Sequence, residues 1–277
     1  ALPTAFTVET VAAGFNAPVQ VAFLPDGRAL VAEHAGLVRL VQSNGTKTTF
    51  LDLRSRVNNY GERGLIGIAL DPDFANRPYL YAYYIFEHDA ANPTGPKTGR
   101  LARYTVSGDT ASLASEVVLL GTVGGDSCAV VTSDCIPSDY RDHHGGTIRF
   151  APDGTIFVTT GDGATVHGIT PNALRSQNID SLAGKLLHVD RDGNGLATNP
   201  FYDGSPSSNR SKVWAYGFRN PFRFTLRPLD GTPYVGDVGW DTWEELNVVV
   251  RGGNYGWPCY EGAPRQPGYE PTATCQA

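Results

Sequence analysis

The feature that most constrains the fold is a short hairpin pattern that occurs four times along the chain. In each copy, a run of β-branched or aromatic residues leads into a turn containing Pro and Asp, and a second such run follows. The turns lie at residues 25–27, 72–74, 152–154 and 228–231. Pro suits the first central position of a turn, and Gly allows positive φ at low steric cost. Repeated hairpins predict an all-β fold and argue against a helical bundle.

The spacing of these turns favours a β-propeller. Successive turns begin 47, 80 and 76 residues apart, and a four-stranded blade takes about 40–45 residues. The first interval fits one blade, whereas each of the others fits either two blades or one blade with a long insertion. A β-sandwich is the alternative, although its strands would not carry the same turn throughout. No linker divides the chain, so we expect a single β-propeller domain over residues 1–277.

Charge and hydropathy narrow the choice of partners. The formal net charge is −6, and only 18% of the residues are charged. Proteins that bind nucleic acid carry clustered Lys and Arg, which this composition does not suggest. No apolar run approaches the length of a membrane span. We therefore expect neither a nucleic-acid partner nor a membrane-spanning segment.

The four cysteines fall into two local pairs in loop-like stretches. Local pairing predicts the disulfides Cys128–Cys135 and Cys259–Cys275, although four cysteines allow three pairings. Disulfides persist in oxidising compartments, and the chain begins with Ala1 rather than Met. We therefore expect an exported protein, either secreted or periplasmic.

A candidate catalytic pair flanks the third turn. Facing residues of a hairpin have a constant sum of residue numbers, near 305–306 here, and His143 and Asp162 satisfy it. A carboxylate on one imidazole nitrogen fixes the tautomer and raises the basicity of the other nitrogen, as a general base requires. The alternatives are a buried histidine that caps the loop, or a metal site formed by His143 and His144.

Three further segments carry candidate ligand contacts. Arg219, in the loop before Asn220, suits an anionic or carbonyl-rich ligand, or is simply a surface arginine. The glycines of residues 236–256 could offer main-chain carbonyls to a hard cation, although the aromatic residues there could equally form core. Residues 190–195 resemble half of a calcium-binding loop, but Phe201 stands where such a loop needs Glu. We expect a tight turn there, with a metal site as the alternative.

Four longer strings resemble a known family: GERGLIGIALDPDF (61–74), DHHGG to TTGDG (142–163), YGFRNPFRF (216–224) and EELNVVVRGGNYGWP (244–258). In this order they resemble the glucose/sorbosone dehydrogenase family, from about Phe15 to Gly262. The resemblance implies a six-bladed β-propeller of four-stranded antiparallel blades that uses pyrroloquinoline quinone (PQQ) and calcium. It further implies oxidation of the anomeric hydroxyl of an aldose sugar, with hydride transfer to PQQ and a soluble electron acceptor.

The resemblance also implies roles for individual residues. His143 matches the catalytic base, Asp162 its partner carboxylate, and Asp142 an acidic neighbour at the cofactor. Arg219 and Asn220 match the pair at the quinone carbonyls, where Arg219 would stabilise charge that develops on oxygen.

Other matched positions carry the cofactor contacts. Gly239 and Trp240 match positions whose main-chain carbonyls hold calcium next to the cofactor. Glu62 and His167 stand where glucose dehydrogenases of the family have glutamines at the site. The family continues past residue 258 with blades whose Lys and Arg hold the cofactor, whereas this sequence ends at Ala277. We expect that the last blades are missing and belong to a further C-terminal segment of the same polypeptide; closure with fewer blades is the alternative.

These departures support two rival hypotheses. The acidic Glu62 and the missing contacts favour a non-catalytic extracellular binding module on the same scaffold. A calcium-dependent propeller hydrolase or lactonase is the other, with His143 and Asp162 activating water. The first hypothesis remains an exported PQQ-dependent aldose dehydrogenase, and the sequence does not identify its sugar.

Overall fold

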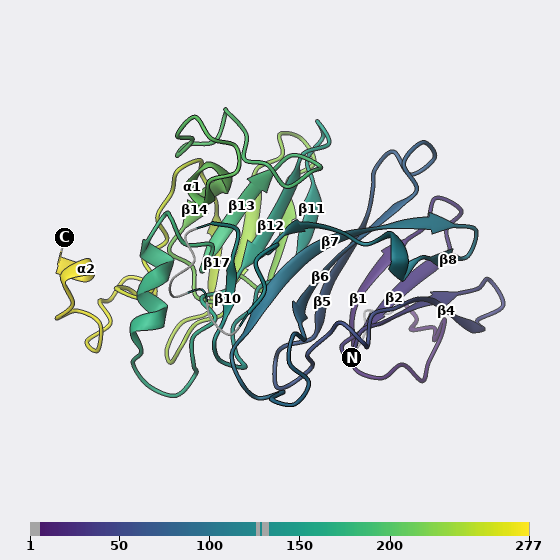
Figure 1. Ribbon diagram of the computed structural model, residues 1–277, viewed down its shortest axis with the longest axis horizontal. Coiled ribbons are helices and arrows are strands. Elements are labelled where there is room, and N and C mark those ends of the chain that lie inside the picture. Colours follow the sequence, from purple (N-terminus) through teal and green to yellow (C-terminus); the bar gives the residue numbers. More distant parts are fainter. Residues whose placement is uncertain (1–5, 126–127, 129–132, 277) are drawn as a thin grey trace.

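Each of the four repeated hairpins forms the first two strands of one antiparallel β-sheet (Figure 1). The computed structural model describes residues 6–125, 128 and 133–276. The turns predicted at residues 25–27, 72–74, 152–154 and 228–231 all connect paired strands. The hairpin prediction is therefore confirmed in all four places.

The first sheet comprises β1 (Pro18–Phe23), β2 (Ala29–Glu33), β3 (Leu37–Val41) and β4 (Lys47–Asp52). The second comprises β5 (Leu65–Leu70), β6 (Tyr79–Phe86), β7 (Lys97–Ser107) and β10 (Ile136–Ser138), with β8 (Thr110–Ala111) and β9 (Val117–Leu120) paired to β7. The third comprises β11 (Ile148–Phe150), β12 (Ile156–Thr160), β13 (Lys185–Val189) and β14 (Val213–Tyr216). The fourth comprises β15 (Arg223–Leu226), β16 (Pro233–Asp237) and β17 (Glu245–Val248). The helices are short: α1 (Asn209–Lys212), α2 (Ala273–Gln276) and two 3-10 helices at Leu113–Ser115 and Pro171–Gln177.

An all-β propeller is confirmed, but the expectation of six blades is wrong for this chain, whose described residues form four sheets. The expectation of six blades rests on the family resemblance, whereas the four repeated hairpins each begin one of four sheets. Each long interval between turns holds one blade with insertions rather than two blades. The insertions are the β8–β9 region and the loop before β10 in the second sheet, and residues 161–184 and 190–212 in the third.

The hydrophobic core lies between neighbouring sheets. Alternate side chains of a strand point to opposite faces, so a middle sheet can pack against two neighbours at once. In β12, for example, Val158 joins the cluster shared with the second sheet, whereas Phe157 joins the cluster shared with the fourth. A third cluster joins the first and second sheets, with members Leu30, Val38, Leu80 and Tyr104.

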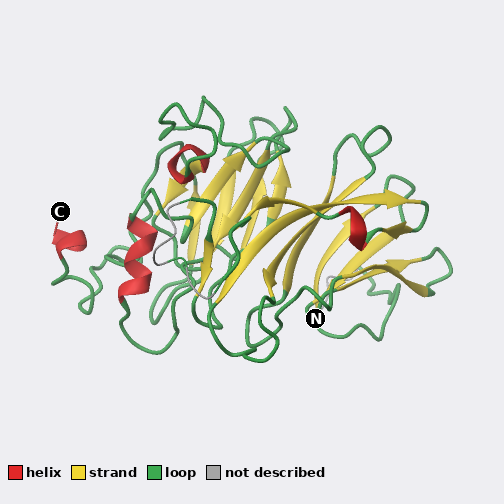
Figure 2. Cartoon of the chain, viewed as in Figure 1, coloured by secondary structure: helices red, strands yellow, loops and turns green. Residues whose placement is uncertain are grey.

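The first strands of the sheets lie close together and bring the loops before them to one place. Strand β5 contacts both β1 and β11. From β15, Arg223 Nη2 donates to the main-chain oxygen of Val19 in β1 at 2.9 Å. Figure 2 shows the long loops gathered at the ends of the strands. The loops that precede β5, β11 and β15 carry Glu62, His143 and Asn220.

The remaining predictions about local structure can be compared directly. The disulfides Cys128–Cys135 and Cys259–Cys275 are both present, which confirms the local pairing. At residues 190–195 the chain makes a turn, in which Asp190 Oδ1 accepts the main-chain N–H of Asp192 and of Asn194, both at 2.9 Å. Within the described residues, no group of three or more His, Cys, Asp or Glu side chains could hold a metal ion. None of the helices in that part of the chain is long and apolar enough to span a membrane.

Packing between sheets predicts a large cost for truncating its central side chains. Leu187 is 0% exposed in the cluster between the second and third sheets. We expect Leu187→Ala to lower the free energy of unfolding by about 2–5 kcal/mol, because it removes apolar contacts and leaves a cavity. Leu229, 94% exposed in a turn, is the matched control, and Leu229→Ala should change stability by under about 0.5 kcal/mol. Urea unfolding of both variants checks this; equal effects would contradict packing between sheets.

Candidate functional site

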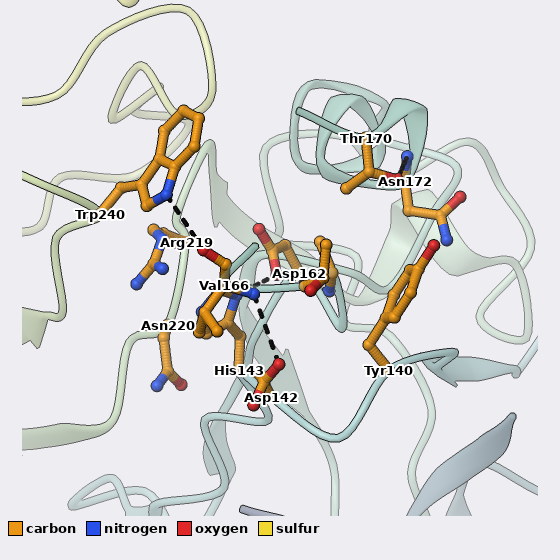
Figure 3. A network of polar contacts seen from close by, with 12 residues as sticks. Tyr140, Asp142, His143, Asp162, Val166, Thr170, Asn172, Arg219, Asn220 and Trp240 are labelled. Carbon is orange, nitrogen blue, oxygen red and sulfur yellow. Dashed lines mark hydrogen bonds and ion pairs between the residues drawn. The ribbon is translucent and has the colours of Figure 1, made fainter. Parts of the chain in front are cut away.

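The third hairpin brings the predicted base and its carboxylate together. Strands β11 and β12 pair Ile148 with Val158 and Phe150 with Ile156. The two chains stay together beyond the strands, and Gly163 N–H donates to His143 O at 3.1 Å. His143 Nδ1 then lies 2.9 Å from Asp162 Oδ1, as the hairpin register predicts (Figure 3).

The local backbone around His143 is unusual. His143 has φ +60°, in the left-handed region that non-glycine residues adopt rarely. Glycine is needed opposite it, because a Cβ on Gly161 would lie 2.1 Å from the main-chain oxygen of His143. Rare backbone conformations cluster at functional sites, where the surrounding structure holds them. Gly161 therefore permits the close approach that joins His143 to Asp162.

Asp162 is fully buried, and both of its oxygens are used. Oδ1 accepts from His143 Nδ1 at 2.9 Å and from Ala164 N–H at 2.8 Å, while Oδ2 accepts from Trp257 Nε1 at 2.8 Å. Burial acts to raise the pKa of Asp162, but His143, the Ala164 N–H and Arg219 together hold the pKa below its ordinary value. An ionised Asp162 favours the tautomer of His143 with the proton on Nδ1. His143 Nε2 is buried and has no partner among the described residues.

A second buried carboxyl, Asp237, holds the Arg219–Asn220 segment. Its two oxygens accept the main-chain N–H of Arg219 at 3.0 Å and of Asn220 at 2.7 Å. Burial raises the pKa of Asp237 to about 8. Asn220 Oδ1 in turn accepts from Gly145 N–H at 3.0 Å, next to His143. These bonds tie the loop before β15 to the loop before β11.

The Arg219 guanidinium contacts the loop around Gly239 and Trp240, for which the family resemblance implies calcium binding. Its Nη1 donates to Val238 O at 3.1 Å and to Gly239 O at 2.7 Å, while its buried Nε has no partner in the described chain. The main-chain N–H groups of residues 240–243 all donate to one oxygen of Glu261, at 2.7–3.2 Å. Trp240 Nε1 donates to Val166 O at 3.3 Å. Gly239 and Trp240 therefore lie beside Arg219, and the carbonyl of Gly239 accepts a hydrogen bond from it.

The other predicted residues divide into two groups. Glu62 Oε2 accepts the main-chain N–H of His143 at 2.9 Å. Figure 3 shows Asp142 Oδ2, which accepts the main-chain N–H of Val166 at 3.4 Å. Both therefore lie within the site. His167, in contrast, is exposed, so the structure does not bring its side chain together with the others.

A cavity of about 320 Å³ lies where the first strands of the sheets begin and is lined by Glu62 and Asn220 of the site, whereas His143, Asp162 and Arg219 are not among its lining residues. Its wall is largely apolar, with a few polar side chains, a combination typical of small-molecule sites. Burial lowers the pKa of His144, on this wall, to about 3, so that imidazole stays neutral at physiological pH. The apolar lining includes Val19, Ile66, Phe222 and Val238, and the polar lining includes Glu62, His144, Asn220 and Arg223.

Three residues of the site were not identified from the sequence: Asp237, Trp257 and Glu261. Each is buried and binds another segment of the site: Asp237 and Glu261 bind segments 17–21 residues away, whereas Trp257 and Asp162 are 95 residues apart. Asp237 lies within residues 236–256 and Trp257 within the string 244–258, both considered in the sequence analysis, but spacing alone indicates no role for either residue. For Glu261 no sequence signal is evident.

Comparisons with known proteins show which family the chain belongs to. The sequence model of the family described as Glucose / Sorbosone dehydrogenase matches residues 15–272. Quinoprotein glucose dehydrogenase B of Acinetobacter calcoaceticus is 28% identical over 280 residues, covering 95% of this chain and 55% of that protein. The PQQ-bound aldose sugar dehydrogenase of Streptomyces coelicolor is similar in structure, with a TM-score of 0.72, 30% identity, and coverage of 94% of this chain and 68% of that one.

A relative of another kind also matches. Human Hedgehog-interacting protein is 26% identical over 245 residues, covering 78% of this chain and 31% of that protein. The chain spans about half the length of the Acinetobacter relative, at 55% of it.

The close approach at Gly161 can be tested by adding a single methyl group. Gly161→Ala places a Cβ against the main-chain oxygen of His143, so it should separate the two segments and lower the free energy of unfolding by about 1–3 kcal/mol. Gly236→Ala is the matched control, because a Cβ there would lie 3.5 Å from its nearest neighbour, Arg223 O. Thermal unfolding of both variants provides the measurement. A stable Gly161→Ala protein that keeps the His143–Asp162 bond would contradict this reading.

The raised pKa of Asp237 predicts a dependence of stability on pH. The folded protein keeps this proton up to about pH 8, whereas an unfolded Asp loses it near pH 3.9. Stability from this group is therefore complete below about pH 3.9 and is lost as the pH rises towards 8. Asp237→Asn removes this contribution, so wild type should lose stability relative to the variant as the pH rises from 5 to 8. Urea unfolding at several pH values checks this; a constant difference would contradict it.

Proposed function

Because the chain belongs to the glucose/sorbosone dehydrogenase family, we propose that it is an exported, PQQ-dependent dehydrogenase that oxidises the anomeric hydroxyl of an aldose. The observation that carries the proposal is the buried His143–Asp162 pair, with Nε2 of His143 left without a partner in the described chain. Two disulfides support export, because such bonds persist in oxidising compartments.

The residues of the site fit PQQ, a flat aromatic molecule with quinone carbonyls and carboxylates. The cavity beside Asn220 offers apolar walls to an aromatic ring. Arg219 offers a buried guanidinium whose Nε has no partner among the described residues, and such groups suit carbonyl and carboxylate oxygens. When bound, PQQ supplies the acceptor for the hydride that leaves C1 of the sugar.

The protein's own residues would move the proton and stabilise charge. His143 takes the proton of the anomeric hydroxyl at Nε2, and Asp162 stabilises the resulting imidazolium through Nδ1. A positioned general base contributes about 10²–10⁴-fold in rate. Arg219 stabilises negative charge that develops on oxygen, and its burial strengthens that interaction because water competes less. Asp237 keeps Arg219 and Asn220 in place through their main-chain N–H groups.

Calcium enters the proposal only in the binding test below, which is run with and without Ca²⁺. Gly239 O accepts a hydrogen bond from Arg219 at 2.7 Å. A cation at this carbonyl would share the oxygen with the positively charged guanidinium, so Gly239 O is not a free cation ligand in this arrangement. We derive no catalytic step from calcium.

A non-catalytic binding module is the second candidate. The similarity to human Hedgehog-interacting protein favours it, as does Glu62, whose carboxylate serves the main chain of His143. A module of this kind would use the same cavity for a ligand without proton transfer at His143. It therefore predicts that His143 can be replaced without loss of function.

Reconstitution distinguishes these candidates. We expect the protein to bind PQQ in a calorimetric titration, run with and without Ca²⁺, and to reduce a redox dye with at least one aldose from a panel. His143→Gln should lower kcat by about 10²–10⁴-fold, the contribution of a general base, while the affinity for PQQ changes little.

His188→Gln is the control for this experiment. His188 is also buried, but it bonds Asn199 and Thr155 in the third sheet, away from the cavity. This variant should keep kcat even if it loses stability. If PQQ does not bind, or if His143→Gln and His188→Gln behave alike, the proposal is wrong.

A further inference from the structure

Trp257 contacts two residues that the proposed function uses. Its indole Nε1 donates to Asp162 Oδ2 at 2.8 Å. Its ring also lies under the Arg219 guanidinium, whose central carbon is 5.4 Å from the ring centroid. Trp257 is 5% exposed, so water does not compete for either contact.

The hydrogen bonds of Asp162 show why the indole matters. His143 and Ala164 both donate to Oδ1, so Trp257 is the donor that the structure gives to Oδ2. Asp162 is 0% exposed, and a buried carboxylate oxygen without a donor is costly. Loss of the indole N–H would let the carboxylate rotate to find other donors, and the bond from His143 Nδ1 would weaken.

The rest of the structure holds Trp257 firmly. Its main-chain N–H donates to Gly217 O at 2.9 Å, and its own carbonyl accepts from Gln177 Nε2 at 2.7 Å. Its ring contacts Trp240 and Tyr269 with centroids 5.9 and 5.8 Å away. The Cys259–Cys275 disulfide closes the segment that follows. An indole fixed from several sides can set the orientation of the groups that it touches.

We propose that Trp257 is a positioning residue that fixes the carboxylate of Asp162 and the guanidinium of Arg219 relative to His143. This role rests on the proposed function for its effect on catalysis, although the contacts themselves do not. It assigns a purpose to the C-terminal segment, residues 257–275: this segment holds the indole against a site built mainly from the third and fourth sheets.

Trp257→Phe tests the proposal, because it keeps an aromatic ring and removes the N–H donor. In the full chain, we expect the His143 Nδ1 proton to exchange with solvent at least about tenfold faster, as measured by NMR, since its bond to Asp162 loosens. In the reconstituted enzyme, kcat should fall at least about tenfold while KM changes less than about twofold, the pattern of a group that acts on the transition state.

Tyr269→Phe is the matched control. Tyr269 belongs to the same aromatic cluster, and its hydroxyl accepts from Thr170 N–H rather than touching Asp162. It should destabilise the protein without changing the exchange of the His143 proton or kcat. Equal effects of the two variants on exchange would show that Trp257 has only a packing role, and would overturn the proposal.

A double-mutant cycle keeps the test independent of activity. If the indole acts through Asp162, Trp257→Phe should cost less free energy of unfolding in an Asp162→Ala background than in wild type. Additive costs would overturn the proposal. If no sugar is oxidised but exchange and coupling behave as expected, the proposed function fails while the positioning of Asp162 by Trp257 stands.

Discussion

The site depends on the complete pairing of one buried negative charge. Asp162 has no exposed surface, and a buried carboxylate is tolerated only when donors surround it. Those donors come from three separate places: His143 before β11, Ala164 after β12, and Trp257 beyond β17. The third hairpin, the loop behind it and the C-terminal segment must therefore all be folded before the charge is satisfied. In this way a single carboxylate links the stability of distant segments to the tautomer of His143.

The propeller provides the rigid frame for this arrangement. Each middle sheet packs against two neighbours, which fixes the first strands and the loops that precede them. The functional groups lie in loops, and carboxyl side chains bind the main chain of those loops: the exposed Glu62 at His143, the buried Asp237 at Arg219 and Asn220, and the buried Glu261 at residues 240–243. Main-chain contacts of this kind set the position of a loop without depending on which side chains it carries. They also explain how a site made of loops can be buried and ordered.

The sequence predicts local relations well and long-range ones poorly. The turn residues identify all four hairpins, and counting across the third one places His143 next to Asp162, because hairpin register depends only on the turn. The number of blades is not local: an 80-residue interval holds two blades or one with insertions, and only the strand pairing decides. A count without gaps places His167 at the cofactor, whereas the structure leaves it exposed, in a stretch that begins and ends with glycines at positive φ, Gly163 and Gly168. Trp257 could not be found, because nothing in its neighbourhood reveals a partner 95 residues away.

The tautomer of His143 is the most direct test of the account. ¹⁵N NMR of the imidazole at neutral pH, with His143→Gln used to assign the signals, distinguishes a protonated from a bare ring nitrogen. The account predicts a proton on Nδ1, held by Asp162, and a bare Nε2 able to accept the proton of a substrate hydroxyl. A proton on Nε2 with Nδ1 bare would contradict it, because His143 could then neither donate to Asp162 nor act as a base from Nε2.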